Sequence, residues 1–248
     1  MINAFITVRS KSTRLPRKCF LPFGDMSVIE HIIIRSKNYH LRPIVCTTSN
    51  MDDKDIIKIS KKHGVDWFIG SEINKLKRWN DCCTKFKIDT FHSVDADDPF
   101  FCGEEIQRSH ELLLNGFDMV TPSPSSMNGG ATVGYSLTSQ ILAKACQHIS
   151  DNTDTEMMWG YMNKVHNIKI AKLEDPVESI INQRMTLDYE EDYKKLVKVL
   201  DLVGHFATRH DVAKCLAENP HLKDMNNAKN IEWKENQLPV DRAKRQIG

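Results

Sequence analysis

The chain has 248 residues and a formal net charge of +1, and 40% of its residues are hydrophobic. Such a composition is typical of a globular protein with one large core, and so small a net charge gives no long-range field to attract nucleic acid or an anionic membrane. The seven cysteines are odd in number and show no CxxC spacing, which argues against a disulfide framework and against a zinc ribbon.

Along the first half of the chain, short β-branched runs alternate with segments of helical periodicity. The pattern predicts strands over residues 2–8, 43–48, 66–69, 90–94 and 117–121, and helices over residues 28–36, 52–63, 75–86 and 104–114. This alternation is typical of a three-layer α/β fold with a mostly parallel sheet. In such folds, ligands bind at the carboxyl ends of the strands.

The second half of the chain is less regular. Residues 122–134 are rich in Pro, Ser, Asn and Gly, which predicts a loop near the site or a flexible flap. Beyond it we expect helices over residues 138–148, 155–165, 190–202 and 209–218, strands over residues 168–173 and 183–187, and a weakly patterned tail from residue 219. The simplest partition is one α/β domain over residues 1–203 with a C-terminal helical extension over residues 204–248.

No apolar run reaches 18 residues, and the first predicted strand starts at residue 2, which leaves no room for a signal peptide. We therefore expect a cytoplasmic protein.

Residues 9–18, which follow the first predicted strand directly, hold five cations and no acid. Arginine offers forked donors to phosphate oxygens and lysine a compact charge, and three hydroxyl residues are interleaved with them. The segment is not a Walker loop, because it contains no glycine and GxxxxGK[ST] is absent. Its place after a strand favours a polyphosphate site over a solvated basic loop.

The order of residues in this loop resembles a known signature. "RSKSTRLPRK" is similar to the R-x-x-S-T/S-R-L-P-G-K loop of the cytidylyltransferases that activate acidic sugars, which include CMP-Kdo synthetases, CMP-sialic acid synthetases and spore coat polysaccharide biosynthesis proteins. The segments "IVCTTSNMDDKDI", "WFIGSEINKLKRW", "VDADDPFF" and "RMTLDYEEDYKKL" follow the family's later motifs in order, so the resemblance covers about residues 2–203.

The resemblance implies a fold of the nucleotide-diphospho-sugar transferase type, which is GT-A-like and Rossmann-like. It implies Mg²⁺-dependent transfer of a cytidylyl group from CTP to a Kdo-like or sialic acid-like ketosugar acid, with release of pyrophosphate, for surface polysaccharide synthesis. It also implies a homodimer, with residues 122–182 as the acceptor-binding or dimerisation part. Neither nucleic acid nor a membrane is an expected partner.

Several residues acquire roles from the same resemblance. The implied catalytic residues are Arg14, Lys18, Asp97 and Asp188, and Asp97 and Asp188 are also the implied Mg²⁺ ligands. The implied nucleotide-binding residues are Arg9, Ser10, Lys11, Ser12, Thr13, Arg14, Lys18, Thr47, Thr48, Ser71 and Arg78.

The acidic residues leave alternatives open. Strand alternation points Asp95 and Asp97 to one face and Asp98 to the other. Asp188 precedes a predicted helix, so it is a metal ligand, an N-cap, or both. Asp192 is interpreted as a first-turn residue that favours the helix dipole.

Two residues depart from the family loop. Lys11 stands where a small residue is usual, and Arg17 where glycine is usual. Without glycine the backbone would approach phosphate less closely and charge would compensate, unless the nucleotide is held differently or the substrate is unusual. Residues 122–182 match the family least, so the resemblance does not name the acceptor.

Other functions remain open from the sequence. A phosphonate or a small phosphorylated alcohol would also serve as acceptor for such an enzyme. Asp95-Ala96-Asp97 reads as the DxD motif of a glycosyltransferase, although such an enzyme has no need of the basic loop. A non-catalytic nucleotide-binding module is the third alternative, and the two candidate metal carboxylates argue against it.

Overall fold

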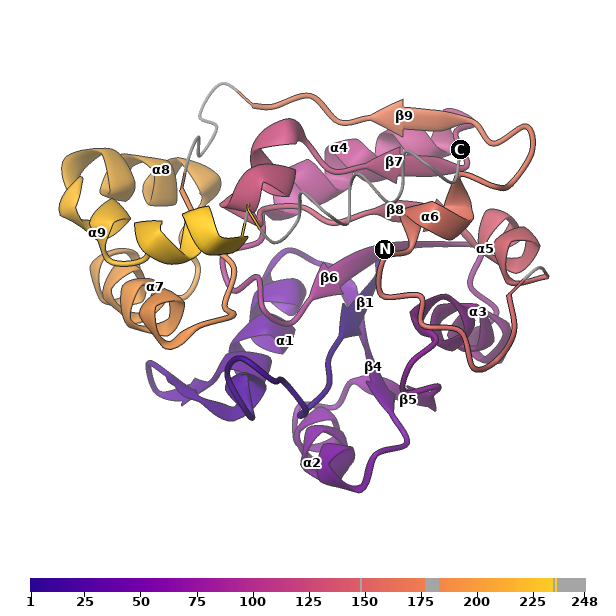
Figure 1. The fold of residues 1–248 in the computed structure, drawn as a ribbon, viewed down its shortest axis with the longest axis horizontal. Helices are drawn as coiled ribbons and strands as arrows, with labels where there is room; N and C mark the ends of the chain where they lie inside the picture. The colour runs from indigo at the N-terminus through magenta and orange to yellow at the C-terminus, as the bar shows by residue number, and fades with distance from the viewer. Residues whose placement is uncertain (148, 177–182, 234, 236–248) are drawn as a thin grey trace.

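The computed structural model describes residues 1–147, 149–176, 183–233 and 235. Seven strands form one sheet in the order β5-β4-β1-β6-β8-β7-β9, with helices on both faces (Figure 1). The strands are β1 (Asn3–Thr7), β4 (Arg42–Thr48), β5 (Asp66–Gly70), β6 (Thr90–Asp95), β7 (Met119–Thr121), β8 (Ser136–Thr138) and β9 (Ile170–Lys172). Only β8 runs against its neighbours, so the predicted mostly parallel α/β sheet is confirmed.

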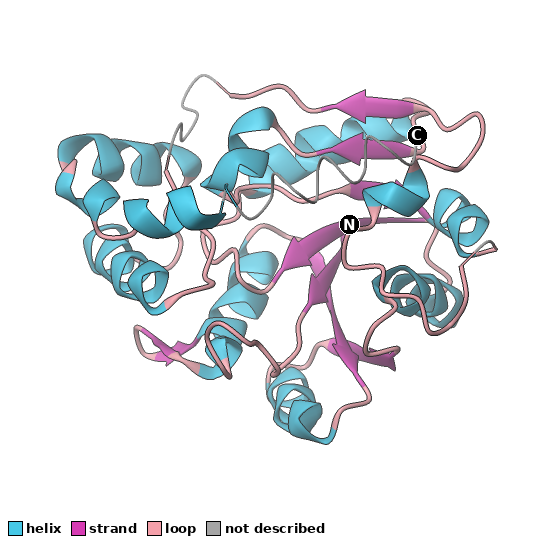
Figure 2. Ribbon diagram, in the orientation of Figure 1, coloured by secondary structure: helices cyan, strands magenta, loops and turns pink. Residues whose placement is uncertain are grey.

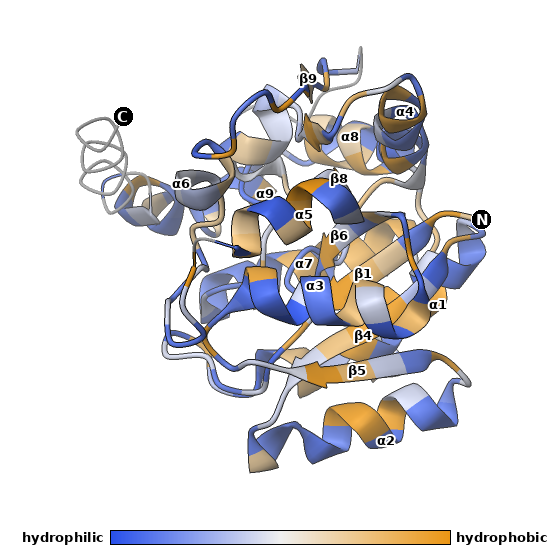
Figure 3. Cartoon of the chain, turned by 90° about the vertical axis from the view of Figure 1, so that its right-hand side faces the viewer, coloured by the Kyte–Doolittle hydropathy of each residue, from blue (hydrophilic) through white to orange (hydrophobic). Residues whose placement is uncertain are grey.

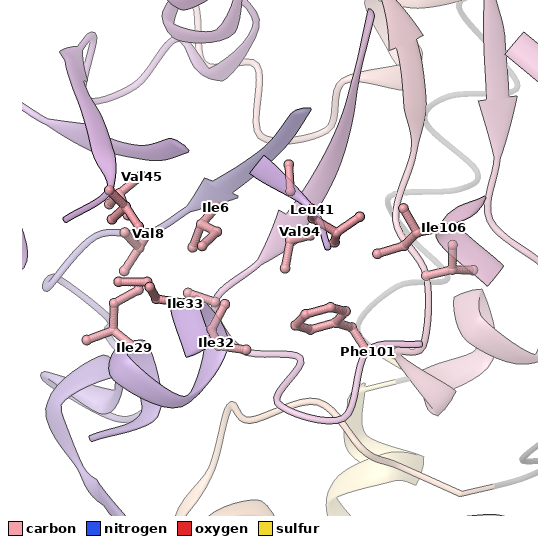
Figure 4. Close-up of a cluster of buried hydrophobic side chains, with 14 of the residues drawn as sticks. Ile6, Val8, Ile29, Ile32, Ile33, Leu41, Val45, Val94, Phe101 and Ile106 are labelled. Carbon is pink, nitrogen blue, oxygen red and sulfur yellow. The ribbon is translucent and has the colours of Figure 1, made fainter. Parts of the chain in front are cut away.

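Side-chain alternation along β1 explains the three layers. Ala4 and Ile6 face α1 (Val28–Asn38), α2 (Lys54–Lys62) and α4 (Gly103–Leu114), and Figure 4 shows Ile6 beside the isoleucines of α1. Phe5 points to the other face, where its ring stacks 4.2 Å from that of Phe91. The helices on that face are α3 (Lys75–Phe86), α5 (Ser139–Cys146) and α6 (Trp159–Met162) (Figure 2).

The helices are amphipathic, as their periodicity predicts. Figure 3 shows apolar central strands between helices whose outer surfaces are largely hydrophilic. In the described part of the chain, no helix is long and apolar enough to cross a membrane.

The C-terminal helices close one side of the molecule. These helices are α7 (Glu190–Val203), α8 (Arg209–Glu218) and α9 (His221–Asp224), and residues 227–233 are also helical. Leu196 and Leu216 share a buried cluster with Phe23, Phe100 and Leu187, which lie around the carboxyl ends of the strands. The C-terminal helices therefore pack on the α/β domain through a common core. The predicted boundary at residue 203 stays a prediction.

Four sequence predictions differ from the structure. Residues 183–187 are not a strand, because the Met185 N–H donates to the Gly129 carbonyl at 2.8 Å and the Leu187 N–H to the Asp97 carbonyl at 2.7 Å. These carbonyls belong to loops and do not form a ladder. The predicted helix over residues 155–165 is only the short helix α6 in the structure. The loop predicted over residues 122–134 contains a helical turn at Ser126–Gly130. Strand β8 was not predicted, because three residues are too few to show alternation.

The remaining short elements lie beside the basic loop. They are a 3₁₀ turn at Lys18–Phe20, a hairpin of β2 (Pro22–Phe23) and β3 (Met26–Ser27), and a 3₁₀ turn at Met51–Asp53 that leads into α2. The capping box of Ser27 and Glu30 begins α1 directly after the hairpin. The loop is thus bounded by β1 on one side and by an anchored helix on the other.

The tight junction between β6 and β8 makes Gly134 a sensitive position. A Cβ on Gly134 would overlap the carbonyl oxygen of Ser93, so alanine there must displace the backbone of β6. We expect Gly134→Ala to lower the free energy of unfolding by about 1–3 kcal/mol, as other overpacked substitutions do. Urea denaturation measures this. Gly160→Ala is the control because nothing lies within 4 Å of its added Cβ, and equal effects of the two variants would contradict the account.

Candidate active site

A pocket of about 810 Å³ opens at the carboxyl ends of β1 and β6. The basic loop forms one wall, and the other walls come from the ends of β1 and β6, the segments after β4 and β5, α3, and the residues preceding α7. The lining residues are Thr7, Val8, Arg9, Ser10, Lys11, Ser12, Thr13, Arg14, Pro16, Arg17, Lys18, Cys19, Asp52, Glu72, Arg78, Asp95, Ala96, Asp97, Glu156 and Asp188. All four of the predicted catalytic residues therefore meet in one pocket.

Each of the five loop cations lies within 4 Å of a carboxylate oxygen. The pairs are Arg9–Glu156 at 3.5 Å, Lys11–Glu72 at 3.4 Å, Arg14–Asp188 at 2.9 Å, Arg17–Asp55 at 3.7 Å and Lys18–Asp97 at 2.7 Å. The exposed pairs among them contribute little to stability. Together the five pairs compensate the charge of the loop.

The most enclosed of these cations is Lys18. Its Nζ donates to Asp97 Oδ2 at 2.7 Å, to Asp188 Oδ1 at 3.0 Å and to the Leu187 carbonyl at 2.7 Å. Burial by itself would lower the pKa of this ammonium group, but the two carboxylates outweigh it and raise the pKa. Lys18 is therefore charged and holds two acidic side chains together that would otherwise repel each other.

Asp188 is held from both sides by cations. Arg14 Nη2 lies 2.9 Å from its Oδ1 and Arg184 Nη2 lies 2.9 Å from its Oδ2. Burial would raise the pKa of this carboxyl group, but Lys18 and Arg14 outweigh burial and lower it. The N-cap interpretation of Asp188 is wrong, because the N-cap of α7 is Tyr189.

Asp192 has a larger role than the helix dipole alone. It is fully buried, and it accepts hydrogen bonds from the N–H groups of Asp188 and Tyr189. Arg184 Nε donates to both of its oxygens, at 3.0 and 3.1 Å. Asp192 thus fixes Arg184 and the backbone of Asp188, and through them the carboxylate that lines the pocket.

The acidic turn after β6 places some of its carboxylates in the pocket and one outside it. Asp95 and Asp97 line the pocket whereas Asp98 does not, which is the arrangement expected from alternation. Burial raises the pKa of Asp98, and the neighbouring Asp97 and Asp95 raise it further. Lys75 Nζ lies 3.5 Å from Asp95 Oδ1 and partly compensates the acidic charge.

Three predicted nucleotide-binding residues, Thr47, Thr48 and Ser71, do not line the pocket. Thr47 and Thr48 are buried, do not line the pocket, and donate their hydroxyl hydrogens to Asp53. Ser71 also lies outside the lining, and its Oγ accepts from the Asn74 N–H at 3.0 Å. Their contact with cytidine remains a prediction that the pocket lining does not support.

Arg78 is a predicted nucleotide-binding residue that does line the pocket. Its side chain is buried, and Nη1 donates to the Ser71 carbonyl at 2.6 Å. Burial lowers the pKa of the guanidinium group. Its Nε is buried and has no hydrogen-bond partner among the described residues.

Sequence reasoning missed several residues around the pocket. Glu156 and Lys75 had no predicted role, although Glu156 lines the pocket and lies 4.0 Å from Lys75. Glu156 belongs to the part of the chain that matches the family least. Arg184 acts through Asp188 and Asp192, four and eight residues further along the chain, and Asp53 acts through Ser10, 43 residues before it. Neither residue stands in a pattern that marks such contacts.

Two of the carboxylates that line the pocket, Asp97 and Asp188, fit a hard divalent cation. No cluster of three or more His, Cys, Asp or Glu side chains is arranged to hold a metal within the described residues. Mg²⁺ uses one or two protein carboxylates, with water and substrate phosphates completing its shell. Asp97 and Asp188 match that requirement, because their carboxylate oxygens are suitable ligands and both contact the same ammonium group, that of Lys18.

The sheet topology, the basic loop at a strand end and the paired carboxylates define a nucleotidyltransferase. The chain belongs to the cytidylyltransferase family, whose sequence model matches residues 4–238. This confirms the resemblance noted in the loop and the later motifs. Membership of this family argues against the two other classes that the sequence left open, a glycosyltransferase and a non-catalytic nucleotide-binding module.

Individual proteins are also similar. The Methanocaldococcus jannaschii protein MJ1063 is 28% identical over 234 residues, covering 91% of this chain and 94% of its own. A cytidylyltransferase from Leptospira borgpetersenii superposes with a TM-score of 0.80 at 22% identity, covering 90% of this chain and 96% of its own. CMP:2-keto-3-deoxy-manno-octonic acid synthetase in complex with CTP superposes with a TM-score of 0.61 at 14% identity, covering 81% of this chain and 98% of its own. These two structural likenesses establish the shared fold.

The structure explains why glycine is usual at position 17. Arg17 has φ 56° and ψ 26°, a left-handed conformation that costs an L-residue roughly 1–2 kcal/mol. Its guanidinium lies 4.5 Å from the centre of the Phe20 ring, and its N–H donates to the Ser10 carbonyl at 3.2 Å. The loop thus has a glycine-like backbone conformation at this position and gains a fifth cation.

Substitution at this position should therefore reverse the usual order of alanine and glycine. We expect Arg17→Gly to be more stable than Arg17→Ala by about 1 kcal/mol, because only glycine adopts positive φ without strain. At Lys198, an exposed residue of α7, the order should be the opposite, with alanine more stable by about 1 kcal/mol. Chemical denaturation of the four variants measures both differences, and the same order at both positions would refute the assignment.

Proposed function

We propose that this cytidylyltransferase transfers the cytidylyl group of CTP to a hydroxyl group of an acidic sugar. The observation that carries the proposal is the contact of Lys18 with both Asp97 and Asp188 beside Arg14, inside one pocket. Kdo-like and sialic acid-like ketosugar acids are the acceptor class, on the strength of the loop signature. The product would supply surface polysaccharide synthesis.

The reaction exchanges one P–O bond for another. The oxygen of an acceptor hydroxyl attacks the α-phosphorus of CTP and releases its proton to water, while the bond from the α-phosphorus to the bridging oxygen breaks and pyrophosphate leaves. Catalysis of such a transfer depends on alignment and on stabilising the spreading negative charge. The protein must therefore hold the phosphates in line with the acceptor.

The basic loop would meet the polyphosphate. Arg14 and Lys18 would bind oxygens of the β- and γ-phosphates and stabilise the leaving pyrophosphate, as charge-assisted donors. Because both now contact Asp188, binding would exchange a carboxylate partner for a phosphate partner. The remaining loop cations would contribute in the same way.

A divalent cation would be held by Asp97 and Asp188, which the exchange releases from Lys18. We propose Mg²⁺, which when bound would neutralise phosphate charge and polarise the reacting phosphoryl group. Arg78, which also lines the pocket, would donate a hydrogen bond to the nucleotide.

Two further features belong to the proposal. All seven cysteines are free thiols, which suits a reducing compartment, and we place the enzyme in the cytoplasm. We also propose a homodimer, formed through the part of the chain over residues 122–182. Of that part, the pocket lining includes Glu156.

Nucleotide binding tests the first half of the proposal. Thermal unfolding is measured with CTP, UTP, ATP, GTP and dTTP, each with and without Mg²⁺, since a ligand of the folded state raises the midpoint according to RT ln(1 + [L]/Kd). CTP with Mg²⁺ should give the largest shift, and Lys18→Met should weaken CTP at least tenfold.

Lys194→Met is the matched control, because Lys194 is an exposed residue of α7 that pairs with Glu190. It should bind CTP like the wild type. A CTP shift that survives unchanged in Lys18→Met would disprove the proposed phosphate contact.

An acceptor panel tests the second half. Pyrophosphate release is followed with CTP and Mg²⁺ while Kdo, a sialic acid, a phosphonate or a small phosphorylated alcohol is supplied. We expect turnover with a ketosugar acid. Turnover confined to the phosphonate or to the phosphorylated alcohol would overturn the acceptor class and retain the cytidylyltransferase.

A further inference from the structure

Asp53 is a carboxylate without solvent exposure that lies behind the basic loop. It is 0% exposed and does not line the pocket, so it cannot touch a nucleotide. Five donors converge on it. They are Ser10 N at 2.8 Å and Ser10 Oγ at 2.6 Å on Oδ1, with Thr47 Oγ1 at 3.0 Å, Thr48 N at 3.2 Å and Thr48 Oγ1 at 2.5 Å on Oδ2.

These bonds are made at the expense of a local one. Asp53 is the N-cap residue of α2, but its side chain makes no capping bond to that helix. An aspartate at this position ordinarily accepts from the first-turn N–H groups. Burial would raise the pKa of Asp53, but the hydrogen bonds of Ser10 and the threonines outweigh burial and lower it. The ionised carboxylate is therefore directed to the two strand ends and not to its own helix.

Ser10 transmits this anchoring to the loop. Its N–H and hydroxyl are both given to Asp53, and its carbonyl accepts from the Arg17 N–H at 3.2 Å. Ser10 thus joins the beginning of the loop to its end. Arg14 lies between these points, and Lys18 follows Arg17 directly.

The same carboxylate holds the neighbouring strand. Thr47 and Thr48 end β4, and this strand pairs with β1 in the sheet. Asp53 therefore clamps the ends of two strands, β4 directly and β1 through Ser10. A loop fixed at its base against two strands loses less conformational freedom on ligand binding than a loose one.

We infer that Asp53 is a positioning residue that holds the basic loop in the conformation that binds a polyphosphate. This inference rests on the proposed function, and it assigns a role to a residue that does not touch substrate. Asp53 acts through Ser10 on Arg14 and Lys18. Its removal should weaken ligands in proportion to how much polyphosphate they carry.

Asp53→Asn tests the inference with almost no change in size. The amide has one oxygen and one NH₂ group, so whichever way it turns, its NH₂ faces donors that now lack an acceptor. Binding of inorganic pyrophosphate and of CMP, each with Mg²⁺, is measured by calorimetry on the full chain. We expect pyrophosphate to weaken at least tenfold and CMP less than threefold.

Ile56→Ala is the control for stability. Ile56 is buried on α2, three residues beyond Asp53, and packs in the hydrophobic core, and its side chain carries no group that could bond to Ser10. It should lower the unfolding midpoint at least as much as Asp53→Asn, yet retain wild-type pyrophosphate affinity at a temperature where all variants are folded. If Asp53→Asn and Ile56→Ala both lose pyrophosphate affinity in proportion to the fall in their unfolding midpoints, the role of Asp53 is only structural and the inference is overturned.

Ser10→Ala provides a second test if Asp53→Asn does not fold. It removes one of the five donors and keeps the Ser10 N–H bond. We expect pyrophosphate to weaken by about threefold, with CMP unchanged, and unaltered pyrophosphate affinity would again overturn the inference. A wild-type protein that binds neither CTP nor pyrophosphate would instead disprove the proposed function, and the inference with it. The two failures are distinguishable, because the wild-type protein still binds pyrophosphate when only the inference about Asp53 fails.

Discussion

The ion triad of Lys18, Asp97 and Asp188 is the contact on which the site depends. It joins three segments far apart in sequence: the loop after β1, the turn after β6 and the residues before α7. Two carboxylates this close to one point would repel each other without a cation, and removing one partner of a buried ion group is strongly destabilising. The ammonium group of Lys18 therefore holds the two acidic side chains together in the ligand-free protein.

Two other buried carboxylates hold this triad in place. Asp192 fixes Arg184 and the backbone of Asp188 on the acidic side of the pocket. Asp53 fixes Ser10, and through it the loop that carries Lys18, on the basic side. Each is fully buried and satisfied by several donors, which is the condition under which a buried charge is tolerated. The side chains that would contact substrate are thus held in position by buried carboxylates that do not contact it.

Local sequence predicted the parts of this site that depend on strand ends. The loop after β1 and the turn after β6 were placed correctly because the period of buried strands is readable and ligands of such sheets gather at one edge. The supporting residues were not predictable, since Asp192 resembles an ordinary first-turn acid and Asp53 an ordinary N-cap. The partner of Asp192 is Arg184, which lies eight residues before it and outside its helix, so helical periodicity does not reveal the contact. The partner of Asp53 is Ser10, 43 residues away, which only the tertiary fold brings near. The same reason explains the wrong strand prediction over residues 183–187. Their composition is typical of a strand, but their backbone N–H groups donate to loop carbonyls that are distant in sequence.

The most direct test is an experimental structure of the protein with CTP and Mg²⁺. The account predicts that the β- and γ-phosphates lie against Arg14 and Lys18, and that Lys18 Nζ no longer contacts both Asp97 and Asp188. Ser10 should keep its contacts to Asp53. A polyphosphate bound elsewhere, or a Lys18 that still joins the two carboxylates while CTP fills the pocket, would contradict the exchange on which the proposed mechanism rests.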